Sequence, residues 1–203
     1  MPENKSPERL VFFTDAVVAI AITLLILPLA DAVPEAVAEH QSLTELFSHN
    51  LAKIYSFLLS FAVISRLWVV HHHVFEQVKS YNRRLMSLNF GWLLTIVLLP
   101  FPTEITGLYG NEEFTSALYI GTILAASLFQ VGMVLVIRRD HRLRDDDSEL
   151  ATQPVLATSS NAVVLAIAFV VAVFVPQIGY YMMLLLLLPP LAERIRGARA
   201  QVA

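Results

Sequence analysis

The fold class follows from one segment, Arg9-Leu-Val-Phe-Phe-Thr-Asp-Ala-Val-Val-Ala-Ile-Ala-Ile-Thr-Leu-Leu-Ile-Leu-Pro-Leu29. It is long enough to cross a bilayer, which takes about 20 mostly apolar residues in a helix. It nevertheless contains an acid, Asp15, within its first third. An ionisable side chain at the centre of a membrane helix costs about 2.5–3.5 kcal/mol on insertion scales, and it usually faces a protein interior or an aqueous path. We therefore expect this helix to be a working part of the protein rather than a passive anchor.

The composition also indicates a membrane protein. Of the 203 residues, 56% are apolar, more than an ordinary soluble domain contains. There is no cysteine, which excludes disulfides and thiolate metal sites. Six apolar runs are candidate transmembrane helices, at residues 9–29, 53–74, 85–106, 114–137, 152–175 and 178–195. We predict a single all-α domain, residues 1–203, with six transmembrane helices per subunit.

The lysines and arginines are distributed asymmetrically. All of the fourteen except Lys53 and Arg66 lie before or at the start of the first run, at the end of or after the last, or between the second and third or the fourth and fifth. The opposite loops, residues 30–50, 107–113 and 176–177, contain no lysine or arginine, and the first two are acidic. By the positive-inside rule we expect a multi-pass protein of the cell membrane with both termini in the cytoplasm.

Prolines mark the ends of two spans. Pro28 lies near the end of the first, where a residue without a backbone N–H ends or kinks a helix. The third span closes with Leu99-Pro-Phe-Pro-Thr103. Between the first two spans, Ala32–Ser48 has the pattern of an amphipathic helix at the membrane interface.

On a helical wheel, the first span has a continuous stripe formed by Ile20, Thr23, Leu24 and Leu27. Asp15 lies about 140° from Ile20 at about 100° per residue. One interpretation is that the stripe faces lipid or another helix, with the Thr23 hydroxyl bonded to its own backbone. The other is a pore, in which copies of the stripe around an axis form a hydrophobic constriction that gates by dewetting.

The second span contains three adjacent histidines, His71, His72 and His73. Neighbours on a helix point about 100° apart, so the three cannot converge on one zinc ion. His72 and Glu76 could share a metal, but two ligands make a weak site. A metal site is therefore not expected.

A buried hydrogen-bond network is a better explanation of the polar residues in the second span than a metal site. Asp15 needs a donor in a low-dielectric setting. The available donors are Arg66, a histidine of the cluster, the indole of Trp68, and Asn89 on the third span.

Several well-known functional motifs are missing from the sequence. It contains no Thr-Val-Gly-Tyr-Gly filter, and its fourth span has no arginine ladder typical of a voltage sensor. It also contains no phosphate-binding glycine loop, no Gly-x-Ser-x-Gly elbow and no basic stripe for nucleic acid. An enzyme is therefore not expected.

The first three spans match one known pattern. Arg9, the run Phe13-Thr14-Asp15-Ala16 and the run Ala19–Leu25 resemble the first-helix signature of the transmembrane protein 175 family. These are lysosomal and endosomal potassium channels and their bacterial relatives. Trp68-x-x-His71-His72-x-x-Phe75, and Asn89 followed by the proline motif, match its second and third helices. Thr14 stands where the signature usually has serine.

This resemblance implies a six-helix subunit of the bacterial type that assembles as a homotetramer in membrane lipid, with the first helix lining the pore. It implies a narrow hydrophobic ring at Ile20, a hydroxyl layer at Thr23, and further apolar rings at Leu24 and Leu27. It also implies a structural polar network around the first helix, to which we add Arg9, Arg66 and His72. The network implied by the family consists of Phe13, Thr14, Asp15, Trp68, His71 and Asn89.

The expected function is passive conduction of potassium and other monovalent cations, with no cofactor and no nucleic-acid partner. An alternative is a proton-coupled secondary transporter that uses Asp15 and the cluster His71–His73 as a relay. A membrane metalloenzyme centred on the same histidines is a third possibility.

Overall fold

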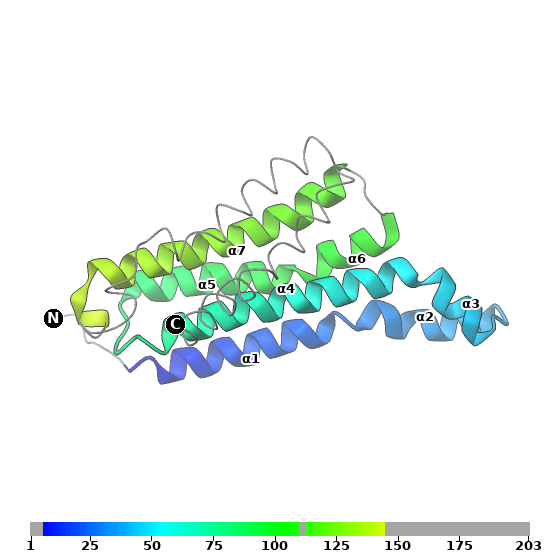
Figure 1. The fold of residues 1–203 in the computed structure, drawn as a ribbon. Helices are drawn as coiled ribbons and strands as arrows, with labels where there is room; N and C mark the ends of the chain where they lie inside the picture. The colour runs from blue at the N-terminus through cyan, green and yellow to red at the C-terminus, as the bar shows by residue number, and fades with distance from the viewer. Residues whose placement is uncertain (1–5, 110–112, 145–203) are drawn as a thin grey trace, which may run out of the picture.

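The structure is a computed structural model that describes residues 6–109 and 113–144 (Figure 1). Within those ranges the chain is helical apart from turns, caps and one isolated β-bridge. The elements in chain order are α1 (Glu8–Leu24), α2 (Leu27–Ala38), α3 (Leu43–His49), α4 (Leu51–Phe75), α5 (Arg83–Leu98), α6 (Pro100–Tyr109), α7 (Glu113–Arg139) and the short 3-10 helix η1 (His141–Leu143).

Four stretches of the described residues are long and apolar enough to cross a membrane. They are Glu8–Ala38, Leu51–Phe75, Arg83–Tyr109 and Phe114–Arg139. The all-helical fold and the first four predicted spans are thereby confirmed. The two further predicted spans, residues 152–175 and 178–195, lie outside the described residues.

Two of these stretches are interrupted where the prolines predicted it. The first is broken at Leu25 and Ile26, and Pro28 occupies the first turn of α2. The third is broken at Leu99, between α5 and α6, which begins with Pro100. Proline has no N–H to give to the carbonyl four residues earlier, so the helical ladder cannot run through these points unchanged.

The segment predicted as one interfacial helix is divided in two. Helix α2 ends at Ala38, and His40 has a positive φ of 55°, which turns the chain. Helix α3 then starts with a capping box, in which Ser42 and Glu45 bond to each other's backbone N–H groups. Hydrogen bonds from the backbone and hydroxyl of Ser42 lower the pKa of Glu45. The predicted amphipathic segment is therefore two helices, because this cap satisfies the backbone of a new helix start.

The helices form an elongated bundle in which α1 lies along one edge and α7 along the other (Figure 1). Helix α5 packs on α7, α4 packs on α6, and α1 packs on both α5 and α4. At Gly91 the contact between α5 and α7 is so close that an added Cβ would lie 2.4 Å from the Phe129 ring. The largest side chains in the core include Trp92, Ile64 and Ile96.

The two ends of the bundle differ in charge. At one end, which we call the basic end, the α4–α5 loop is tied to η1 by two hydrogen bonds, Lys79 N to the Leu143 carbonyl at 2.8 Å and Ser80 Oγ to the Arg142 carbonyl at 2.7 Å. The other end, with α2 and α3, is the acidic end (Figure 1). The described acidic residues there are Asp31, Glu35, Glu39, Glu45 and Glu104.

Candidate pore helix and its polar support

Helix α1 has one buried face and one open face. The buried face points at α4 and α5 and consists of Leu10, Thr14, Val18, Ala21 and Leu25. The stripe singled out from the sequence lies on the open face, where Ile20 is 60% exposed, Leu24 40% and Leu27 49%. The packing of residues 6–109 and 113–144 therefore leaves this stripe uncovered.

Thr23 lies on the same open face. Its hydroxyl donates to the Ile20 carbonyl at 2.8 Å, as the simpler interpretation of the sequence predicted. Because the proton is used within the helix, the lone pairs of Oγ1 are left to accept or to coordinate. On the open face the Thr23 side chain therefore presents an acceptor oxygen rather than a donor.

Asp15 lies on the other flank of α1 and is half-buried. Its Oδ1 accepts a hydrogen bond of 2.8 Å from the indole Nε1 of Trp68 on α4. This bond satisfies one carboxylate oxygen and joins α1 to α4. It also keeps the charge on the side of the helix away from Ile20.

A second set of bonds ties α1 to α5 and α4. Asn89 Nδ2 donates to Thr14 Oγ1 at 2.8 Å, and Thr14 donates to the Leu10 carbonyl at 2.8 Å. Asn89 Oδ1 lies 2.7 Å from His71 Nε2. The amide oxygen can only accept, so His71 must carry its proton on Nε2. The three buried side chains form one directed chain from α4 through α5 to α1.

The imidazole of His71 is held by two aromatic rings. Its centroid lies 4.4 Å from that of Phe75 and 4.2 Å from that of Trp92, both in stacked geometry. This sandwich fixes the ring plane and therefore the direction of the Nε2–H bond. Trp92 was not predicted, although it follows Asn89 by three residues on α5 and so shares its face.

Other predicted network residues lie apart from these bonds. Of the donors proposed for Asp15, Trp68 makes the bond and Arg66 does not; the buried Arg66 Nε has no hydrogen-bond partner among the described residues. Arg9 is exposed at the start of α1. Phe13, also half-exposed, packs against Phe90 with ring centroids 5.8 Å apart.

The three histidines do not share one partner: His71 faces Asn89, whereas His72 and His73 both face Glu76. His71 bonds to Asn89, whereas His72 Nε2 lies 3.5 Å from Glu76 and stacks on Trp68. His73 Nδ1 lies 3.3 Å from the same carboxylate. Within residues 6–109 and 113–144, no three histidine, cysteine or acidic side chains are placed to hold a metal ion. The structure of this part gives no support to a metal centre.

One cross-helix contact was missed from the sequence. Gln130 is buried on α7 and donates through Nε2 to the Leu67 carbonyl at 2.7 Å. The one side-chain amide of the fourth span was the available signal. It fastens α7 to α4 next to Trp68.

Comparison with known proteins agrees with these features. Residues 9–100 match the sequence family described as endosomal/lysosomal potassium channel TMEM175. A protein of Chamaesiphon minutus named as a potassium channel is 33% identical over 133 residues, covering 63% of this chain and 64% of that protein. A potassium channel of Streptomyces collinus is 35% identical over 126 residues, covering 62% and 57%. The match thus spans less than two thirds of each of these curated relatives.

A solved structure shares the fold. It is described as the crystal structure of a lysosomal potassium-selective channel TMEM175 homolog from Chamaesiphon minutus. The TM-score is 0.75 at 23% identity, over 89% of this chain and 94% of that one. Residues 9–100, the part of the chain that is similar to the TMEM175 family, include both the open stripe of α1 and the network that supports it.

Proposed function

We propose that the chain forms a potassium-permeable channel of the cell membrane, in which four copies surround an axis lined by α1. The observation that carries this proposal is the division of α1 into two faces. Its buried face and its acid are held by α4 and α5, while Ile20, Leu24 and Leu27 are left open. A helix built in this way presents an apolar stripe to neighbouring copies and hides its charge behind.

The proposed subunit has six transmembrane helices with both termini in the cytoplasm. The basic end, with its lysines and arginines, is then the cytoplasmic end, as the positive-inside rule requires. Coverage of 94% of the related channel chain at a TM-score of 0.75 supports the channel fold. The name of that structure and those of the bacterial relatives support potassium as the permeant ion.

Conduction would be controlled where the stripe is most apolar. A ring of Ile20 side chains would exclude water when narrow and so stop ions without a charged gate. The next ring toward the acidic end would be Thr23, whose oxygen lone pairs are available because its proton goes to the Ile20 carbonyl. Four hydroxyl oxygens are fewer than a carbonyl filter offers, so we expect moderate selectivity for potassium over sodium.

Substitution of Ile20 tests this arrangement. Ile20→Asn should increase potassium flux into proteoliposomes, because a polar ring stays wet at a diameter where an isoleucine ring is dry. The matched control is Leu128→Asn on α7, which replaces an apolar side chain of similar exposure, 57% against 60%. Flux that is equal in Ile20→Asn and wild-type protein, at equal reconstitution, would contradict the gate.

The geometry gives less support to the proton-coupled transporter. A relay between Asp15 and His71 would need groups that both accept and donate protons. Asp15 instead bonds to the indole of Trp68, which can donate only, and His71 bonds to the Asn89 amide. Uptake that saturates and follows an imposed pH gradient would favour the transporter over the channel.

A further inference from the structure

A second polar cluster lies inside the protomer, toward the acidic end and separate from the open stripe of α1. Helices α4, α6 and α7 each contribute two buried hydroxyl groups spaced three or four residues apart. The six residues are Ser56, Ser60, Thr103, Thr106, Ser116 and Tyr119. At this spacing, each pair lies on one face of its helix.

One member of each pair belongs to a bonded layer. Ser60 Oγ lies 2.8 Å from Thr103 Oγ1 and 2.7 Å from the Tyr119 hydroxyl. Thr103 gives its proton to the Leu99 carbonyl at 2.7 Å, so it accepts from Ser60, and Ser60 accepts from Tyr119. The protein itself satisfies this layer.

The other three members lie about one turn nearer the acidic end. Helix α4 starts at that end, α6 finishes there and α7 starts there, so the second layer consists of Ser56, Thr106 and Ser116. Thr106 Oγ1 and Ser116 Oγ are both fully buried and have no hydrogen-bond partner among the described residues. Unbonded hydroxyls in an apolar interior are unfavourable, since buried polar groups are nearly always bonded to protein or to water.

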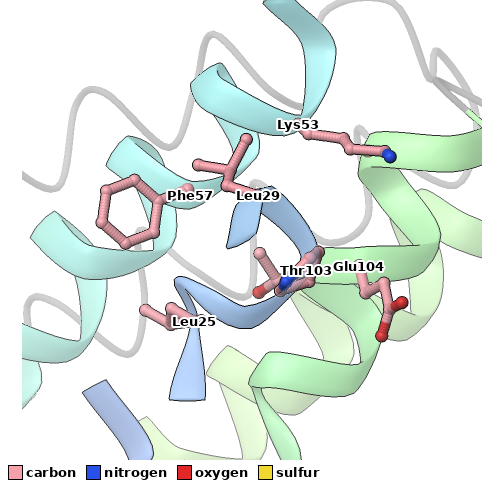
Figure 2. A pocket seen from close by; sticks show the side chains of 8 residues that line it. Leu25, Leu29, Lys53, Phe57, Thr103 and Glu104 are labelled. Atoms are coloured by element: carbon pink, nitrogen blue, oxygen red, sulfur yellow. The ribbon is translucent and has the colours of Figure 1, made fainter. Parts of the chain in front are cut away.

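A surface pocket reaches one member of this cluster, Thr103. It lies at the break between α1 and α2, and side chains of α4 and α6 also line it (Figure 2). Its lining includes the charged side chains of Lys53 and Glu104 and also Thr103, a member of the bonded layer. The lining also includes Phe57 and Gly107, the sequence neighbours of Ser56 and Thr106, so the pocket comes close to the second layer, although none of its three members lines the pocket.

We propose that each protomer contains an internal hydration site, in which water enters by this pocket and bridges Ser56, Thr106 and Ser116. Water is the ligand that fits, because the site offers small neutral hydroxyls that both donate and accept, and no charged group within the layer. The site supports the packing of α6 against α4 and α7. It does not depend on the proposed channel activity.

Isosteric substitutions test the hydration site. Thr106→Val and Ser116→Ala should each lower the thermal midpoint of the purified protein in detergent by about 2–4 °C, because each removes an anchor for bridging water. The matched control is Thr122→Val on α7, whose hydroxyl bonds within its own helix to the Leu118 carbonyl at 2.8 Å. The decrease in the thermal midpoint should be larger than that of Thr122→Val. Potassium flux should stay at the wild-type level.

The opposite results overturn the proposal. A thermal midpoint above that of the wild-type protein would mean that the hydroxyls are buried without water. A midpoint equal to that of Thr122→Val would mean that they bond within their own helices. Water-edited solid-state NMR of the wild-type protein in liposomes gives an independent readout. Signals of Thr106 and Ser116 should receive magnetisation from water, while buried Ala126 should not. No transfer to Thr106 or Ser116 would also overturn the site.

Discussion

At the scale of single residues, a chain of buried hydrogen bonds with fixed donors and acceptors holds α1 in place. The His71 ring is clamped by Phe75 and Trp92, which points its Nε2–H at Asn89. Asn89 in turn uses its amide to hold Thr14. Each bond is modest by itself, but each leaves a buried polar atom unpaired if its partner is lost.

Asn89→Leu should lower the stability of the protein by about 1–3 kcal/mol, because the buried Nε2–H of His71 then has no acceptor. The double variant His71→Phe with Asn89→Leu should recover much of this loss, since phenylalanine keeps the stacking and removes the donor. Chemical denaturation of the purified variants measures both effects. A double variant as unstable as the sum of the two single ones would show that the hydrogen bond contributes little.

At the scale of helices, α1 and the α5–α6 unit are shaped by breaks and by close packing. Pro28 and Pro100 place the breaks, and the sequence predicted both. The contact of α5 with α7 depends instead on the absence of a side chain at Gly91, opposite Phe129. Such a contact cannot be inferred from one sequence, because it depends on which helix lies opposite.

Gly91→Ala should destabilise the α5–α7 contact by about 1–3 kcal/mol, the usual effect of overpacking. An added Cβ would approach three carbons of the Phe129 ring at 2.4 to 2.9 Å, so the ring must move. Gly132→Ala is the control, because its Cβ would meet Leu88 at 3.4 Å, an ordinary contact. Unfolding in detergent compares the two, and equal stabilities would refute the steric argument.

At the scale of the whole molecule, the bond between Asp15 and Trp68 connects the proposed pore helix to the rest of its protomer. Loss of this bond should loosen α1 and therefore affect how copies assemble around the axis. The carboxylate itself lies away from Ile20 and would not contact the permeant ion.

Asp15→Ala should therefore reduce the fraction of tetramers more than the flux of each tetramer. Asp15→Asn is the matched control, because its side-chain oxygen still accepts from Trp68 and should preserve assembly. Light scattering after size exclusion gives the oligomeric state, and proteoliposome flux gives conduction. Normal tetramers of Asp15→Ala with altered permeation would overturn this role.

Much of the architecture followed from local sequence properties. Apolar length predicted the first four spans, prolines predicted the breaks, and helical periodicity separated Asp15 from the stripe of Ile20. The sequence did not show that Trp68, rather than Arg66, is the partner of Asp15. Several donors of the right kind lay on the second span, and only their direction in space distinguishes them.

The amino-acid order was sufficient for features that depend on one helix at a time, namely its length, its apolar face and its break points, because bilayer thickness and helical pitch act on each segment separately. Packing between helices determined the rest. The aromatic clamp on His71, the Gln130 contact to the Leu67 carbonyl and the hydroxyl layers each join residues distant in the chain. Their partners are set by how neighbouring helices meet, and that depends on the shapes of all of them together.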